Sequence, residues 1–480
     1  MIRWVVGVLL VFVFGVSEVR ALELSPMFTS HAVLQRDADV PVWGWAKPGS
    51  AVTVTFAGKT VKAKAGKDGY WMATLKPLKA NKEPQTMVVE GDGEKKELAD
   101  LLVGEVWFCS GQSNMEFTIG SKEKDIIGGA LMPAHIDPSK FPTIRHIKIK
   151  RTGSKTLERK TETHGGWKVC NKQNASSFTA VGFFFAQRLV EELDVPIGLV
   201  EATWGGFNIE PFIPVEGYDV MKSFDAKWDP APKKYSELYN GIVATVIPYA
   251  IRGTIWYQGE SNIHEGEVYL YKMKALIEGW RKVWGQGDFP FYFCQLSSYG
   301  NWTSPKGAEG WALPREAQRR ALVIKNTGMA VLSDVGNKKD VHPKNKYDVG
   351  QRLALWALAK DYGKKDLVYS GPLYKSVEFK DGKAILSFDH AEGLKAARKK
   401  SPQDMGDPVP AGKLRGFSIA GPNKKFHWAD AKIEGDKVIV SSGKVKNPTA
   451  VRYTYNTTVH HGNLYNGANL PASPFITDEW

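Results

Sequence analysis

Residues Leu101 to Phe117 read LLVGEVWFCSGQSNMEF, and the fold can be worked out from this stretch. Its first eleven residues are almost continuously apolar and end in a glycine, which is the pattern of a strand buried on both faces of a parallel sheet. A serine just past such a strand can expose its hydroxyl and turn its backbone N–H toward a bound acyl oxygen. Ser113 is therefore a candidate nucleophile, and a serine that only caps a helix is the alternative interpretation.

Four further apolar runs resemble the first one. They are VPIGLVEATWGG (195–206), AIRGTIWYQGES (250–261), FPFYFCQLSSY (289–299) and GMAVLSDVGN (328–337). Segments with apolar residues three and four positions apart lie around and between them and predict helices over Phe178–Leu193, Tyr235–Tyr249, Val268–Trp284, Leu313–Lys325 and Tyr347–Tyr362. This alternation predicts an α/β, doubly wound domain whose ligands bind at the carboxyl ends of its strands.

Both ends of the chain show a different, strand-like pattern. Val52 to Phe56 alternates apolar residues with threonine, and comparable short runs punctuated by glycine or proline fill residues 22–100. The alternation returns after Gly371. We therefore predict a β-sandwich domain over 22–100, the α/β domain over 101–370 and a second β-sandwich-like domain over 371–480. Within the last of these, Lys395 to Lys413 is expected to be a charged insertion or surface loop.

The first 21 residues have the pattern of a signal peptide. Arg3 precedes a short apolar run, and Val19-Arg20-Ala21 resembles a cleavage site, which predicts export to the periplasm or the extracellular space; a retained membrane anchor is the alternative. No later stretch is long enough to span a bilayer. Only three cysteines occur, at positions 109, 170 and 294, so the fold cannot depend on a disulfide framework, and they lack metal-ligand spacing.

The net charge of +13 comes from dispersed lysines, without the arginine and aromatic interleaving of a nucleic-acid site, so no nucleic-acid partner is expected. A solvated basic surface is the simplest interpretation. The sequence makes no prediction of oligomeric state.

A base for Ser113 is suggested by the segment DVHPKN. His342 follows Asp340 by two residues, so the carboxylate could orient one imidazole nitrogen while the other faces the serine. Gly205, Gly206 and the amide of Gln258 follow other predicted strands and could supply the N–H donors of an oxyanion hole. Packing glycines and a structural glutamine are the alternatives.

An ordered set of motifs resembles the sialate O-acetylesterase family of SGNH hydrolases. They are VLQRDADVPVWGWAKPG, GQSNMEF, VGFFFAQRL, PIGLVEATWGG, IWYQGESN, DFPFYFCQL, REAQ, DVHPKNKYDVGQRLALWAL and NLYNGANLPASPF. The resemblance spans Met27 to Phe475 and implies a flavodoxin-like SGNH hydrolase domain flanked by β domains, without a metal or organic cofactor. It also implies Ser113 as nucleophile, His342 as base, Asp340 as its orienting acid, and Ser113, Gly206 and Gln258 as oxyanion donors. Two positions depart from the family pattern: Lys339 stands where the family has its aspartate, and Phe207 where a threonine commonly follows the glycines.

The predicted reaction is the removal of an O-acetyl group from a sugar through an acyl-enzyme. Candidate substrate-binding residues are Gln112, Asn114, Glu260, Trp204 and Arg315. Gln112 and Asn114 could offer neutral donors beside the nucleophile, and Arg315 could bind a sialate carboxylate if the fold brings it close. Glu260 could instead hold the loops, and Trp204 could be core. Two alternatives remain open: an esterase for acetylated xylan or another polysaccharide, and a carbohydrate-binding protein without activity.

Overall fold

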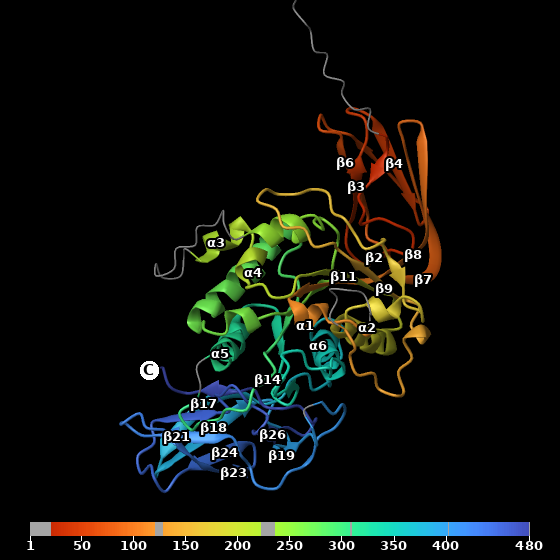
Figure 1. Cartoon of the computed structure of the whole chain (residues 1–480). Coiled ribbons are helices and arrows are strands. Elements are labelled where there is room, and N and C mark those ends of the chain that lie inside the picture. The colour runs from red at the N-terminus through yellow and green to blue at the C-terminus, as the bar shows by residue number, and fades with distance from the viewer. Residues whose placement is uncertain (1–20, 121–127, 222–235, 308–309, 402, 480) are drawn as a thin grey trace, which may run out of the picture.

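The computed structural model describes residues 21–120, 128–221, 236–307, 310–401 and 403–479. The predicted signal peptide therefore lies almost entirely outside the described residues. A β module at the N-terminal end, a central α/β layer structure and a second β module follow one another along the molecule (Figure 1). None of the described helices is long and apolar enough to cross a membrane.

The N-terminal module contains two groups of paired strands, of which the second belongs to the same sheet as the central strands. One is antiparallel and contains β1 (Glu23–Leu24), β3 (Val40–Trp45) and β6 (Tyr70–Leu75); the other pairs β4 (Ala51–Phe56) with β5 (Lys59–Lys64) and β7 (Asn81–Gly91). Val52, Val54 and Phe56 on one face of β4 are buried, whereas the threonines between them are only half-buried. The alternation in the sequence therefore corresponds to a strand with one face on the core.

Strand β8 (Glu94–Gly111) continues from this module into the central sheet. Its first half pairs antiparallel with β7, and residues 102–104 pair parallel with β2 (Val33–Gln35). Residues 105–111 pair parallel with β11 (Ile197–Thr203), and residues 107–111 with β12 (Gly253–Tyr257). The boundary predicted between residues 100 and 101 thus falls inside one continuous strand.

The central sheet has the order β10-β9-β11-β8-β12-β13-β15. Its other strands are β9 (Ile144–Lys148), β10 (Lys168–Val169), β13 (Phe291–Cys294) and β15 (Thr327–Ala330), and all neighbours are parallel except β10. The helices are α1 (Ser113–Glu116), α2 (Ala180–Leu193), α3 (Val215–Met221), α4 (Glu267–Trp284), α5 (Ala312–Arg320) and α6 (Tyr347–Lys360). Short helical turns lie at 138–140, 175–177, 210–212, 260–262 and 321–323.

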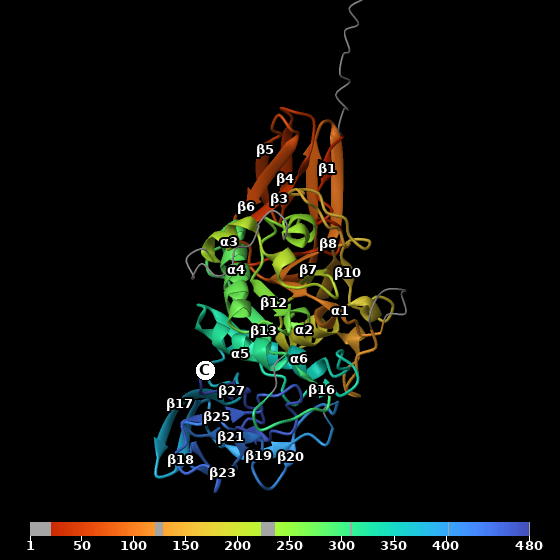
Figure 2. The same cartoon turned by 60° about the vertical axis from the view of Figure 1, so that its left-hand side comes forward.

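Helices cover both faces of this sheet (Figure 2). Trp107 of β8 packs against Phe185 of α2 on one face, and Phe108 packs against Trp280 and Trp284 of α4 on the other. Successive side chains of a strand point to opposite faces, so a strand covered on both sides needs apolar residues at every position. This confirms the α/β class predicted for the central domain.

The helix predicted over Tyr235–Tyr249 is present in part. Among the described residues, 237–238 are α-helical and Tyr239–Val243 form a five-residue π-helix, and turns follow up to residue 248. Gly241 packs directly against the backbone carbonyl of Thr152, and Pro248 has no N–H with which to continue a helix. The apolar residues three and four positions apart in this segment are therefore buried by the packing of an irregular stretch, and they do not require a continuous α-helix.

Three antiparallel sheets build the C-terminal module. Their orders are β17-β18-β24-β23, β20-β19-β26 and β22-β21-β25-β27. The strands are β17 (Leu373–Lys380), β18 (Lys383–Asp389), β19 (Lys395–Arg398), β20 (Val409–Pro410), β21 (Phe417–Ala420), β22 (His427–Trp428), β23 (Asp430–Glu434), β24 (Lys437–Ser441), β25 (Ala450–Tyr453), β26 (Leu464–Tyr465) and β27 (Phe475–Ile476). Strands β14 (Ser298–Tyr299) and β16 (Gly336–Asn337) pair in parallel and form a two-stranded sheet between this module and the central sheet.

Residues 395–413, predicted as an insertion or surface loop, are partly strand and partly buried. They include β19 and β20, and the ammonium of Lys399 is buried against the carboxylate of Asp348 in α6. The charged composition of this segment reflects ion pairing across the module boundary as well as exposure to water.

Candidate active site

Ser113 lies where β8 ends, at the first residue of the four-residue helix α1. Gly111 has a φ of +131°, and a Cβ added there would be 2.2 Å from the carbonyl oxygen of Tyr257. Gln112 donates its backbone N–H to the same carbonyl at 3.0 Å. Only glycine allows this close turn against β12, and the turn brings Ser113 to the carboxyl edge of the sheet. The serine remains 7% exposed.

His342 approaches Ser113 from the segment between β16 and α6. Its Nε2 lies 2.8 Å from the Ser113 hydroxyl oxygen, and its Nδ1 lies 3.2 Å from a carboxylate oxygen of Asp340. The same Asp340 oxygen accepts the backbone N–H of His342 at 2.9 Å. The Asp340 side chain is 50% exposed. The three residues predicted as nucleophile, base and orienting acid therefore form one hydrogen-bonded line.

The electrostatic surroundings keep this histidine neutral. Burial lowers the pKa of His342, the positive charge of Lys346 lowers it further, and Asp340 opposes both effects. A neutral imidazole with its proton on Nδ1, facing Asp340, leaves Nε2 free to accept the proton of Ser113.

Asn114 has a different role from the substrate contact predicted for it. Its side-chain amide donates to Glu260 at 2.5 Å and to the carbonyl of Val341 at 2.9 Å, and its oxygen accepts from Lys346. Both amide hydrogens are used and the residue is fully buried. Asn114 therefore fastens the serine turn to the histidine segment.

Lys346 and Glu260 are buried groups behind the site. Burial lowers the pKa of Lys346 to about 7 although Glu260 opposes this, and burial raises the pKa of Glu260. The Lys346 ammonium lies 4.8 Å from the ring centre of Phe117 and 5.5 Å from that of Tyr257. Among the described residues, one Glu260 oxygen has no hydrogen-bond partner. The sequence prediction missed Lys346 because it belongs to a lysine-rich stretch that resembles a solvated surface.

The two glycines after β11 have different surroundings. A Cβ on Gly205 would be 3.1 Å from Cβ of Ser113, so the backbone approaches the nucleophile directly. Its N–H donates to Glu116 at 3.3 Å. Gly206 is exposed with a φ of +83°, and no atom surrounds the position its Cβ would take. The space around Gly206 is therefore open, whereas the neighbouring Gly205 packs against Ser113.

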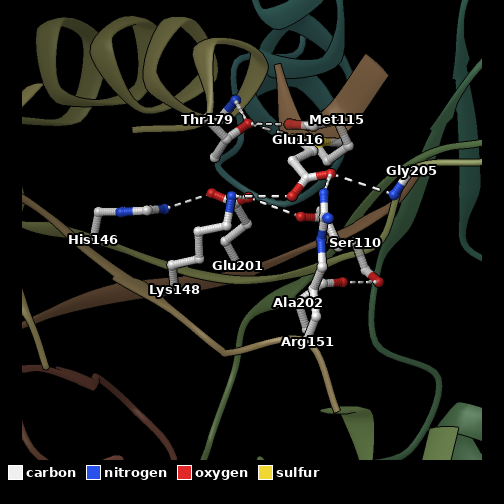
Figure 3. Close-up of polar contacts among 12 residues, drawn as sticks. Ser110, Met115, Glu116, His146, Lys148, Arg151, Thr179, Glu201, Ala202 and Gly205 are labelled. Atoms are coloured by element: carbon white, nitrogen blue, oxygen red, sulfur yellow. Dashed lines mark hydrogen bonds and ion pairs between the residues drawn. The ribbon is translucent and has the colours of Figure 1, made fainter. Parts of the chain in front are cut away.

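A chain of buried charges fixes Glu116 in place (Figure 3). Glu116 accepts from Arg151 at 2.6 Å and from Lys148 at 3.3 Å, and Lys148 also contacts Glu201 at 2.9 Å. Burial would raise the pKa of Glu201, but Lys148 and His146 lower it to about 2. These charges compensate one another, and the Glu116 carboxylate holds the Gly205 segment against the serine turn.

Gln258, predicted as an oxyanion donor, has no spare donor in this structure. Its amide donates to the carbonyl of Phe207 at 3.3 Å and to Asn262 at 2.7 Å, and its oxygen accepts from Tyr269 at 2.8 Å. The side chain is fully buried. Gln258 therefore braces the segment that follows Gly206 and does not point a free N–H at the nucleophile.

Arg315, predicted as a carboxylate ligand, is also turned inward. Its guanidinium donates to the backbone carbonyls of Leu296, Ser297, Asn456 and Thr457. It is 1% exposed, and burial lowers its pKa to about 9. The residue ties the central sheet to the C-terminal module and is not available to a substrate.

Trp204 and Gln112 remain beside the serine turn. Trp204 is half-buried, packs edge-on against Phe207 at 5.2 Å, and has the Arg151 guanidinium 5.9 Å from its ring centre. Gln112 is nearly buried, and its side-chain oxygen has no partner among the described residues. Arg151 was missed by the sequence prediction because it lies outside every motif, 30 residues before VGFFFAQRL.

Known carbohydrate esterases resemble this chain in sequence and in fold. Residues 103–359 match the family of carbohydrate esterases described as sialic acid-specific acetylesterase. The chain belongs to this family. Sialate O-acetylesterases of Pongo abelii and Homo sapiens are each 29% identical to it over 410 residues, which cover 76% of this chain and 76% of each relative. A carbohydrate acetylesterase from Xanthomonas citri is 36% identical and covers 96% of this chain and 100% of its own, with a TM-score of 0.84. The predicted family is confirmed, and the protein is an esterase.

Proposed function

We propose that this family member removes O-acetyl groups from sugars through an acyl-enzyme formed on Ser113. The observation that carries the proposal is the 2.8 Å contact between the Ser113 hydroxyl and Nε2 of His342, with Asp340 at the other imidazole nitrogen. A nucleophile, a base and an orienting group in hydrogen-bond reach are the parts that serine acyl transfer needs.

In the first half-reaction, His342 takes the hydroxyl proton while the Ser113 oxygen attacks the acetyl carbonyl carbon. The carbonyl oxygen becomes an oxyanion, and collapse of this intermediate breaks the bond to the sugar oxygen, which receives the proton from His342. In the second half, water gives a proton to His342 and attacks the acetyl-serine. Acetate leaves, and the proton returns to Ser113.

Two backbone donors are proposed for the oxyanion. The N–H of Ser113 is at the first position of α1, where a helix offers no internal acceptor. The N–H of Gly206 belongs to the exposed turn next to it. Glu116 and Gln258 support this turn from behind through Gly205 and Phe207.

The proposed substrate is an O-acetylated sugar, with O-acetylated sialic acid first because the relatives from Pongo abelii and Homo sapiens are sialate O-acetylesterases. Acetylated xylan or another polysaccharide is the second candidate, since the relative from Xanthomonas citri is a carbohydrate acetylesterase. Export, proposed from residues 1–21, would place the enzyme where such glycans occur.

The test is acetate release from O-acetylated sialic acid, acetylated xylan and an aryl acetate. Ser113→Ala should lower the rate by roughly 10³-fold or more on every substrate, because the nucleophile is lost. Ser110→Ala is the matched control, since that buried serine lies near the end of β8, three residues before Ser113, but donates its hydroxyl to the carbonyl of Ala202. Equal rates in Ser113→Ala and the unchanged protein would refute the mechanism.

A further inference from the structure

A cavity opens in the C-terminal module, and no residue of the candidate active site belongs to it. Its volume is about 580 Å³. Its lining includes Arg398, Arg415, Trp428, His460 and His461. These residues come from four different segments of the module, so the cavity depends on the tertiary fold.

Trp428 gives the cavity an aromatic wall. It is 45% exposed although tryptophan is the largest apolar side chain, and it lies edge-on to His461 with 5.9 Å between ring centres. An indole held at the rim of a hollow offers an apolar face on which the C–H face of a sugar ring can pack.

Two uncompensated cations line the same cavity. Among the described residues, the guanidinium groups of Arg398 and Arg415 make no hydrogen bond and no ion pair, whereas Lys413 is paired with Asp430 at 2.5 Å. A free guanidinium presents parallel N–H donors that match the two oxygens of a carboxylate. The charge of the cavity therefore favours an anionic ligand.

His461 forms part of the cavity wall beside Trp428. Both of its ring nitrogens are covered by neighbouring atoms. This residue therefore shapes the cavity and offers no polar atom to a ligand.

The cavity wall is connected to the catalytic histidine segment. Nδ1 of His460 lies 2.9 Å from the hydroxyl of Ser298 in β14, which pairs with β16. Gln403, between β19 and β20, accepts the backbone N–H of Lys344 at 3.0 Å and donates to the carbonyl of Gly336. The same β19–β20 segment thus borders the cavity and holds the segment that carries His342.

We propose that this cavity is an accessory binding site for a carboxylate-bearing sugar. Trp428 packs against the sugar ring, and Arg398 and Arg415 bind the carboxylate. Binding here does not require Ser113 chemistry, so this inference stands apart from the proposed esterase mechanism. It gives the enzyme a means of retaining an acidic glycan beside its active site.

The test is isothermal titration of the full-length Ser113→Ala protein with glucuronic acid and with glucose, two probes that differ in the carboxylate. Glucuronic acid should bind at least tenfold more tightly than glucose. Trp428→Ala and Arg415→Gln should each weaken glucuronic acid binding at least fivefold. Trp302→Ala, which removes a tryptophan that is 55% exposed and lies outside the cavity, should leave it unchanged.

Three outcomes overturn the proposal: no binding of glucuronic acid, equal binding of glucose, or binding that Trp428→Ala and Arg415→Gln do not alter. The last would place the ligand elsewhere, including at the catalytic site. Aryl acetate hydrolysis by Trp428→Ala in the active protein should match the unchanged enzyme. This separates failure of the accessory site from failure of the esterase mechanism.

Discussion

Replacing Lys346 with methionine should change the pH dependence of the enzyme. Lys346 is buried behind the site, and its positive charge disfavours protonation of His342. In the proposed mechanism His342 must be neutral to act as the base, so kcat/KM should fall on the acid side as the imidazole becomes protonated. Removing the lysine charge raises the pKa of His342, and the acid limb of the profile should then move to higher pH.

The size of this effect follows from the aromatic ring between the two groups. The Lys346 ammonium is 4.8 Å from the ring centre of Phe117, which is 6.2 Å from the imidazole, so at most about 11 Å separates the charge from His342. With an effective dielectric of about 20, a unit charge at that distance contributes about 1.5 kcal/mol. This corresponds to about one pH unit in the pKa of His342. Because the pKa of Lys346 is about 7, the ammonium is largely charged over the acid limb.

The assay is kcat/KM for an aryl acetate between about pH 4.5 and 8, a range chosen to cover histidine ionisation. Lys339→Met is the matched control, because this lysine is exposed on the same segment and water screens its charge. Loss of the hydrogen bond to Asn114 could lower the plateau of Lys346→Met, but the position of the acid limb is read independently of the plateau. An acid limb at the same pH in Lys346→Met and the unchanged enzyme would refute this electrostatic account.

Three further substitutions test other parts of the structure. Gly205→Ala places a methyl group 3.1 Å from Cβ of Ser113 and should lower kcat by about tenfold through displacement of the nucleophile, whereas Gly443→Ala, where no atom lies within 4 Å, should leave kcat unchanged; equal kcat values would contradict the close approach. Asp340→Asn should lower kcat by roughly 10- to 100-fold. This is less than the ~10⁴-fold loss for a fully buried triad acid, because half of the Asp340 side chain is exposed to water. A loss near 10⁴-fold in steady-state kinetics would show that solvent exposure does not weaken the contribution of Asp340. Arg315→Met should destabilise the protein by roughly 3 kcal/mol, because it strips charged donors from four buried carbonyls, and a melting temperature equal to that of the unchanged protein would contradict this role.

The central sheet could be predicted because its strands are covered on both faces. Trp107 and Phe108 point to opposite faces of the sheet, and both faces are covered by helices. Both residues must therefore be apolar, and the continuous apolar run in the sequence predicts the buried strand. The segment around Gly241 misled the prediction because packing against the Thr152 carbonyl, a contact with a distant part of the chain, overrides local spacing. Local periodicity contains no information about that contact.

The site was predictable in part for a related reason. Ser113 and His342 stand out in the sequence because serine acyl transfer requires a nucleophile and a base, which are expected after strand ends. The sequence does not predict the direction in which a polar side chain points. Asn114 and Gln258 follow strands in the same way, yet their partners, Val341 and Phe207 among them, come from other segments and draw both amides inward. Whether a polar group faces substrate or protein depends on those acceptors.

Strand β8 has a consequence for how this enzyme can be taken apart. Strand β8 pairs with β7 in the N-terminal module and with β11 in the central sheet. Truncation at residue 100 would therefore remove the first part of β8, the strand that leads to Ser113, and leave the backbone groups of its pairing partners without hydrogen bonds. Heat or denaturant should therefore melt these two parts in one cooperative transition, and a shortened catalytic fragment should be built from residue 22 onward. The N-terminal module thus holds the first half of the strand that ends beside Ser113, and we expect the catalytic domain to require it for folding.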